Sequence, residues 1–139
     1  MDAFDADALI YAAVPGHPLG RRVAALIGSG SARGPADTGS VLLLPEVLGK
    51  PLRDGATSEV RILAALLASL DLRPVDLATA ELATSLSARY RLRAADAVHL
   101  ATAVSIGADR FITNNQRDFG GDITEIDITY PADLADPDI

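Results

Sequence analysis

The sequence contains no cysteine, which excludes disulfide bonds, thiolate nucleophiles and cysteine-ligated zinc sites. Aromatic residues make up only 4% of the chain and hydrophobic residues 49%, so the core must be aliphatic. No apolar run reaches the length of a transmembrane helix, and residues 1–14 carry acids where a signal peptide requires positive charge. We therefore expect a cytoplasmic protein that does not enter a membrane.

Positive charge is also scarce, because 12 Lys and Arg residues face 19 Asp and Glu residues, for a net charge of −7. A surface that binds nucleic acid nonspecifically is normally basic, so the charge argues against that function. It leaves open an enzyme whose clustered acids bind cations that contact nucleic acid. The 139 residues show no repeat or low-complexity linker and predict a single domain, 1–139, with a flexible acidic tail at about 131–139.

Hydrophobic periodicity predicts helices that alternate with short strands. The clearest helix is 57–70, where Leu63, Leu67 and Leu70 share one face. Further helices are expected at 8–14, 19–30, 40–50, 78–90 and from about Asp96 to Gly107, and strands at 2–6, 72–77, 109–114 and 122–130, with a loop and a very short strand in 32–40. Asp7 and Ser40 are candidate N-caps, and Pro45 weakens the helix that follows Ser40. This alternation predicts an α/β domain around a central, mostly parallel sheet of four to five short strands.

Three separated apolar segments each contain an acid, namely Asp5, Glu46 and Asp96. Ligands of parallel α/β sheets bind beyond the carboxyl ends of the strands, where the first strand ends at Asp5 and the 109–114 strand ends at Asn114 and Asn115. Asp96 begins the helix that leads into that strand, so these residues are expected to converge. Clustered oxygen ligands suit Mg²⁺.

Each of these residues also has an ordinary structural explanation. Asp96 and Asp7 are suited to capping a helix or interacting with its dipole. Glu46 fits a solvated helix face and Asp118 a loop. A single helical histidine such as His99 is usually a packed or surface side chain. The joint arrangement therefore carries the functional interpretation.

Four segments, "FDADALIYA", "LLLPEVLGK", "LRAADAVHLATA" and "FITNNQRDF", occur in the order and approximate spacing of one family. Over about residues 4–127 the chain resembles PIN-domain ribonucleases, in particular VapC-like toxins of toxin–antitoxin pairs. The resemblance implies a PIN-like three-layer sandwich in which helices flank the central sheet.

The resemblance assigns metal-binding and catalytic roles to Asp5, Glu46 and Asp96, and a supporting role to Thr113. The chain departs from the family pattern at Asn115, where many members have an acid. The fourth ligand is then either Asn115 or Asp118.

A second departure concerns the residues after Asp5, since Ala6-Asp7 replaces the usual short polar pair. Asp7 then either adds a carboxylate near the metal or caps the helix.

The activity implied by the resemblance is hydrolysis of RNA phosphodiester bonds that depends on Mg²⁺ or Mn²⁺. It also implies a homodimer and inhibition by a cognate antitoxin protein. Arg91, Arg93 and Arg117 are candidate contacts to RNA phosphates, as are the arginines at 21, 22 and 89. All of them have the alternative role of solvated charges near helix ends.

Two other functions compete with this interpretation. The stretch "FDADAL" is similar to the aspartate pair of haloacid-dehalogenase-like phosphotransferases, but these need a late lysine and Lys50 is the only lysine. A non-catalytic PIN-like module that binds proteins is the alternative from another class, and Asn115 in place of an acid is its best support.

Overall fold

A sheet of five parallel strands forms the centre of the computed structural model, which describes residues 1–30 and 34–139. The strands lie in the order β3-β2-β1-β4-β5, and every adjacent pair is parallel. Their bounds are β1 (Asp2–Phe4), β2 (Thr38–Ser40), β3 (Asp71–Arg73), β4 (Arg110–Ile112) and β5 (Asp127–Thr129). The predicted parallel sheet of short strands is confirmed.

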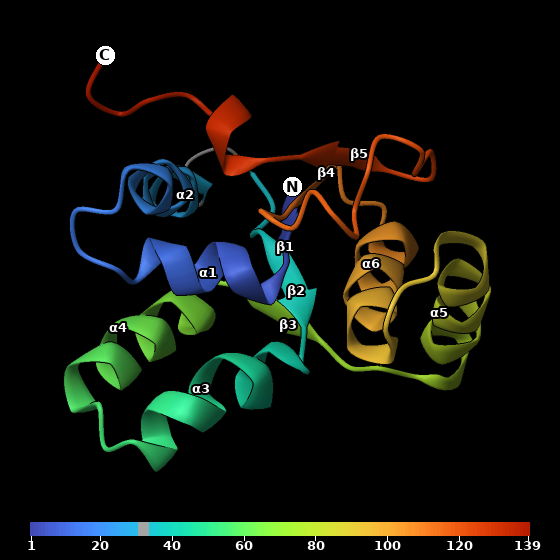
Figure 1. The fold of residues 1–139 in the computed structure, drawn as a ribbon, viewed down its shortest axis with the longest axis horizontal. Helices are drawn as coiled ribbons and strands as arrows, with labels where there is room; N and C mark the ends of the chain where they lie inside the picture. The colour runs from blue at the N-terminus through green and yellow to red at the C-terminus, as the bar shows by residue number, and fades with distance from the viewer. Residues whose placement is uncertain (31–33) are drawn as a thin grey trace.

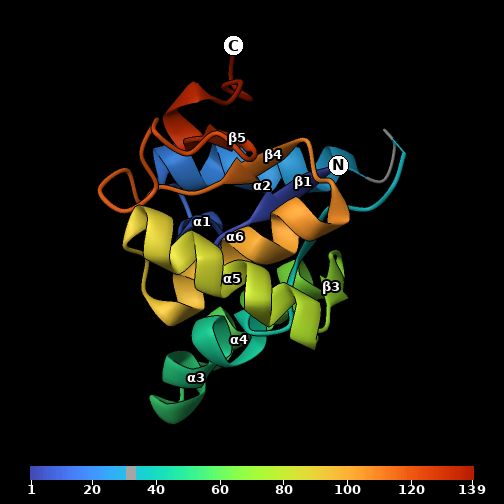
Figure 2. The same cartoon turned by 90° about the vertical axis from the view of Figure 1, so that its right-hand side faces the viewer.

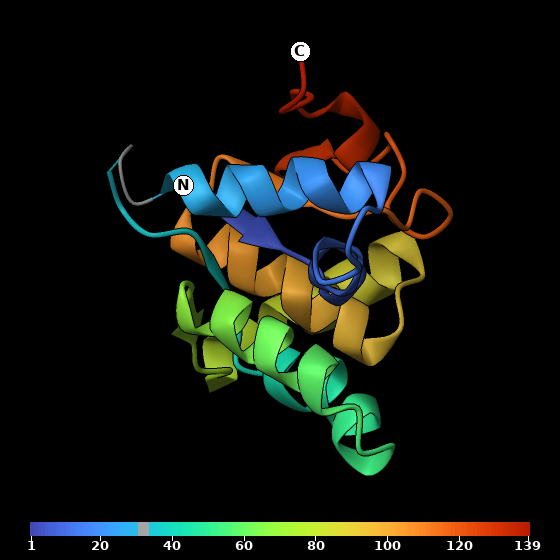
Figure 3. The same ribbon diagram turned by 90° about the vertical axis from the view of Figure 1, so that its left-hand side faces the viewer.

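Helices cover both faces of this sheet and complete three layers (Figure 1). Their bounds are α1 (Ala6–Ala12), α2 (Pro18–Gly30), α3 (Leu43–Arg53), α4 (Thr57–Ala68), α5 (Leu77–Tyr90) and α6 (Ala94–Ile106). Figure 2 looks onto the side of the molecule where α5 packs against α6, and Figure 3 onto the opposite side, where α1, α2 and α4 lie. The three-layer α/β sandwich expected from the sequence is confirmed.

Strand periodicity divides the core into two clusters, one on each face of the sheet. Successive side chains of a strand point to opposite faces. Phe4 and Ile112, which are paired in register, therefore pack with the helices α1 to α4. Their neighbours Ala3 and Phe111 pack with α5 and α6 instead.

Helix α6 carries Asp96 and is buried on almost every side between the sheet and α5. Small residues make this close packing feasible, and the buried side chains of the helix are Ala97, His99, Leu100, Ala101, Thr102 and Ala103. The helix ends as predicted at Gly107, which adopts a left-handed conformation with φ of 73°.

Two predicted helix caps are wrong. Asp5 rather than Asp7 caps α1, because its side chain accepts a hydrogen bond from the N–H of Ala6. Ser40 belongs to β2, and α3 begins after Leu42, which provides no side-chain cap. Pro45 is tolerated because it lies in the first turn of α3, where an N–H has no partner inside the helix.

The edge strands are shorter than predicted. The segment 72–77 contributes only the end of β3, and 122–130 contributes only β5. Edge strands pair on one side alone, and the remaining residues of both segments lack a neighbouring strand. Within 32–40, the short strand is confirmed as β2, whereas residues 31–33 lie outside the described part of the chain.

Several residues of the C-terminal segment, 131–138, contact α2. Arg22 donates hydrogen bonds of 2.9 Å to the carbonyl oxygens of Ala132 and Leu134, and Leu134 is buried. Arg21 forms an ion pair of 2.6 Å with Asp138. The flexibility of this tail stays a prediction. Across residues 1–30 and 34–139, none of the helices combines the length and apolar character needed to cross a membrane.

Candidate functional site

Asp5 occupies the carboxyl end of β1, where its side chain is buried. Because Phe4 pairs with Ile112, the residues that follow them, Asp5 and Thr113, are neighbours across two strands. The Thr113 hydroxyl donates to Asp5 Oδ2 at 2.8 Å, and the Ala6 N–H donates to Asp5 Oδ1 at 2.9 Å. Both carboxylate oxygens are thus fixed by donors from the ends of rigid elements.

The electrostatic environment of Asp5 disfavours its ionised form. Burial raises the pKa of Asp5 from 3.8 to about 7, and the negative charge of Asp7 adds to the rise. The hydrogen bonds from Thr113 and Ala6 and the charge of His99 act in the opposite direction without cancelling it. When no cation is present, Asp5 therefore keeps its proton to a higher pH than an ordinary aspartate does.

Asp7 faces the loop that follows β4. The backbone N–H of Asn114 donates to Asp7 Oδ1 at 3.1 Å, and the Thr113 hydroxyl lies 3.5 Å from the same oxygen. Burial raises the pKa of Asp7, and the charge of Asp96 raises it further. Asp7 therefore lies beside Asp5 in a group of acids, the acid cluster, whose other members are Asp96, Glu46 and Asp118.

Asp96 lies in the first turn of α6 and connects the acids electrostatically. Desolvation is the main cause of its raised pKa, and the charges of Glu46 and Asp118 add to it. His99 and Arg93 partly counteract them. Carboxylates from α3, α6 and the loop after β4 therefore act on one another at the same end of the sheet.

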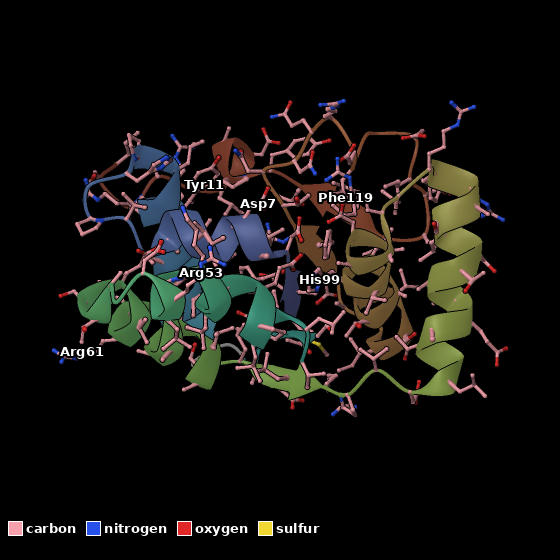
Figure 4. The ribbon with its side chains drawn as sticks, turned by 60° about the horizontal axis from the view of Figure 1, so that its bottom comes forward. Asp7, Tyr11, Arg53, Arg61, His99 and Phe119 are labelled. Atoms are coloured by element: carbon pink, nitrogen blue, oxygen red, sulfur yellow. The ribbon has the colours of Figure 1, made fainter. Side chains whose placement is uncertain are left out.

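Glu46 projects from the first turn of α3, and its carboxylate oxygen Oε2 is hydrogen bonded to Nε2 of His99 on α6. The His99 side chain is fully buried, whereas that of Glu46 is 37% exposed. Figure 4 shows Asp7 on α1 and His99 on α6 near the middle of the molecule, while Arg61 lies at its periphery. The histidine thus ties Glu46 to the helix that carries Asp96.

The loop after β4 is braced by Asn115. Its Nδ2 donates to Asp118 Oδ2 at 3.0 Å, and its Oδ1 accepts from the Asp118 N–H at 3.1 Å. The Asn115 carbonyl accepts a further bond from the N–H of Phe119, whose ring is buried in the core. The amide oxygen of Asn115 is therefore engaged within the loop, whereas the Asp118 carboxylate adds negative charge to the cluster.

Comparison with known proteins agrees with this architecture. The PIN domain family model matches residues 3–120, with the acid cluster inside the matched region. The chain belongs to the PIN domain family. A solved structure described as "Toxin-antitoxin complex from Klebsiella pneumoniae" is similar in fold, with a TM-score of 0.68 and 23% identity over 92% of this chain and 100% of that chain. No protein of curated function matches the sequence significantly.

PIN domains generally depend on divalent metal ions, and the donors of this PIN domain fit such an ion chemically. Asp5, Asp7 and Asp96 offer oxygen donors, and their pKa values are raised mainly by burial and further by neighbouring negative charge, which a cation would offset. Within the described residues, no three acidic or histidine side chains form a group that could hold a metal ion by themselves. Mg²⁺ often keeps several water ligands alongside one or two carboxylates, which suits this open arrangement.

The candidate arginines of the PIN domain fall into two groups. Arg21 and Arg22 bind the C-terminal segment, and Arg89 pairs with Glu125 at 2.8 Å. These three are engaged in contacts within the chain. The other group, Arg91, Arg93 and Arg117, is exposed, and Arg93 lies close enough to Asp96 to lower its pKa.

His99 is packed, as one of the two alternatives from the sequence predicts, but the sequence did not predict its hydrogen bond to Glu46. It lies three positions after Asp96, so both residues lie on neighbouring positions of one helix face. An acid followed at that spacing by a histidine in an otherwise apolar helix was the available signal. What the sequence alone lacked was the position of α3 next to it.

Proposed function

We propose that this PIN domain is a metal-dependent ribonuclease and the toxin of a toxin–antitoxin pair. The observation that carries the proposal is the acid cluster at the carboxyl ends of β1 and β4, where burial and the charges of neighbouring acids raise the pKa values of Asp5 and Asp96. Burying several acids together without a positively charged side chain to pair with them destabilises the folded protein. Such a cost is expected at a site that binds a metal ion, because the ion supplies the missing positive charge.

In this proposal Asp5, Asp96 and Glu46 would hold Mg²⁺ or Mn²⁺ together with water ligands, because these acids do not form a complete site by themselves, and Asp118 would add charge at the rim of the site. When bound, the ion supplies a water of lowered pKa and neutralises charge on the phosphodiester. Asn115 is assigned a bracing role, because its amide oxygen already accepts the Asp118 N–H. Thr113 fixes the orientation of Asp5 by donating to Oδ2.

In the proposed reaction, residues of the chain release a proton, orient the attacking water and bind the RNA. Asp5 would release its proton to solvent if it bound a cation, because a ligating carboxylate must be ionised. Glu46 is the acid most accessible to solvent, so it is the residue suited to orient the attacking water. Exposed Arg91, Arg93 and Arg117 are suited to bind RNA phosphates beside the cluster.

The proposed partner is a cognate antitoxin, and the proposed assembly is a homodimer. Support for the antitoxin comes from the likeness in fold to the solved structure from Klebsiella pneumoniae, which is a toxin–antitoxin complex. Exposed apolar side chains lie on α1, in the turn that follows it and on α3, and they suit a protein contact. They are Ile10, Val14, Leu44 and Leu52.

The test is Mn²⁺ binding measured by calorimetry in two buffers of different ionisation enthalpy, together with cleavage of an unstructured RNA. We expect Mn²⁺ binding at pH 7 to release protons, and Asp5→Asn to lower the number released and to abolish cleavage. Asp76→Asn, which alters an exposed helix cap far from the acids in sequence, is the matched control and should behave as the unaltered protein does. Mn²⁺ binding without RNA cleavage would favour the non-catalytic binding module instead.

A further inference from the structure

We infer that His99 is a positioning residue that holds the Glu46 carboxylate at the acid cluster, an inference that rests on the proposed function. The two residues are 53 positions apart and meet through His99 Nε2 and Glu46 Oε2. Glu46 is the one acid of the proposed set that stands on an exposed helix surface, at a distance in sequence from both strand ends.

The direction of this hydrogen bond follows from the chemistry of its partners. A carboxylate can only accept, so Nε2 carries the hydrogen and donates it. The other ring nitrogen, Nδ1, is buried and has no hydrogen-bond partner among the described residues. The imidazole is therefore held by the packing of its buried ring and by this single hydrogen bond.

The contact restricts a side chain that is otherwise free. Within residues 1–30 and 34–139, no other hydrogen bond holds the Glu46 carboxylate. A glutamate at a helix surface has several rotatable bonds, and most of its rotamers would carry the carboxylate into solvent. Tied to buried His99, Glu46 instead stays close enough to Asp96 to raise its pKa.

This arrangement has a precedent in general metal-site chemistry. Carboxylates that bind metal ions are commonly oriented by hydrogen bonds from residues that do not touch the ion. In this chain the orienting donor is a rigid, fully buried ring on the same helix as Asp96. One helix thus sets the positions of two acids, one directly and one through His99.

The contact itself is tested without metal or RNA by NMR of protein labelled with ¹⁵N in histidine. The chain contains two histidines, so His17 serves as an internal reference. We expect Glu46→Ala to shift the His99 Nε2 resonance and to leave that of His17 unchanged. Because the Glu46 side chain is partly exposed, its truncation leaves the packing of the hydrophobic core unchanged. An unshifted His99 signal would overturn the inference.

The positioning role is tested by Mn²⁺ affinity. His99→Leu removes the donor at similar volume, and we expect affinity to fall by about 10-fold to 100-fold, the usual effect of losing such an orienting residue. His99→Gln restores an N–H near the position of Nε2 and should recover most of the loss. Thr102→Val, which removes another buried polar group from α6, is the control and should leave affinity unchanged.

A double-mutant cycle separates positioning from a general effect on folding. If His99 acts through Glu46, His99→Leu causes no further loss of Mn²⁺ affinity in a Glu46→Ala background. An equal loss in both backgrounds, or equal or tighter binding by His99→Leu alone, would overturn the inference. Absence of Mn²⁺ binding by the unaltered protein would instead refute the proposed function, and the positioning role with it.

Discussion

Asp5→Asn is expected to stabilise the folded protein in the absence of metal. The ordinary pKa of an aspartate is 3.8, and burial together with Asp7 raises that of Asp5 to about 7. Asparagine keeps the acceptor for the Ala6 N–H, and its amide N–H groups can face the Thr113 hydroxyl, which also accepts. The substitution thus removes a charge that folding disfavours and keeps the local hydrogen bonds.

The magnitude follows from the pKa difference between the folded and unfolded chains. At about 1.4 kcal/mol per pKa unit, a rise from 3.8 to about 7 costs the folded state roughly 4 kcal/mol once Asp5 is ionised in both states. Below pH 4 both states are protonated and the cost vanishes. It grows between pH 4 and 7, where the unfolded chain ionises first, and it is constant above pH 7.

The assay is urea unfolding in EDTA from pH 4 to 8.5, with the free energies of unfolding compared between the two proteins. We expect Asp5→Asn to exceed the unaltered protein by about 2 to 4 kcal/mol at pH 8 and to match it at pH 4. Asp76→Asn is the control of opposite sign. The hydrogen bonds of Asp76 to Thr79 lower its pKa, so removing its charge brings no gain at pH 8.

A difference that does not change with pH would show that the substitution acts through packing rather than charge. A variant less stable than the unaltered protein at pH 8 would refute the argument that burial keeps Asp5 partly protonated.

Further results are expected for metal binding, for substitutions in the loop after β4 and for two glycines of α2. Millimolar Mn²⁺ or Mg²⁺ should raise the melting temperature of the unaltered protein through preferential binding to the folded state, and no rise would count against the site. Asp118→Ala should weaken Mn²⁺ binding less than Asp5→Asn does. In the absence of metal, Asn115→Asp should destabilise the loop after β4, because it places a second carboxylate next to that of Asp118, where the contact is now 3.0 Å long. Complete loss of binding in Asp118→Ala would make Asp118 a principal ligand. Gly20→Ala should lower the free energy of unfolding by several kcal/mol, because the added Cβ would lie 1.9 Å from the Tyr11 carbonyl oxygen. A Cβ at Gly28 would have no neighbouring atom within 4 Å, so Gly28→Ala should stabilise α2 by about 0.5 to 1 kcal/mol. Urea unfolding measures both changes.

The elements that depend on local sequence could be predicted from sequence alone. Helix α4 follows from leucines at helical spacing, and α6 ends at Gly107 because a left-handed residue there satisfies the last carbonyl groups. The places of Asp5 at the end of a strand and of Asp96 near the start of a helix could also be predicted, because strand ends and helix starts are recognisable in the sequence. These features involve contacts over only a few residues.

Contacts between distant residues were decided by the tertiary structure. Asp5 rather than Asp7 caps α1 because β1 ends at Phe4, which pairs with Ile112 of β4. The sequence could not show that the Asn115 amide oxygen accepts a hydrogen bond from the Asp118 N–H, and which of the two residues binds a metal ion stays a prediction. The contact of His99 with Glu46 requires α3 to lie beside α6, and this depends on how the whole sheet packs its helices, because no periodicity within either helix encodes the position of the other.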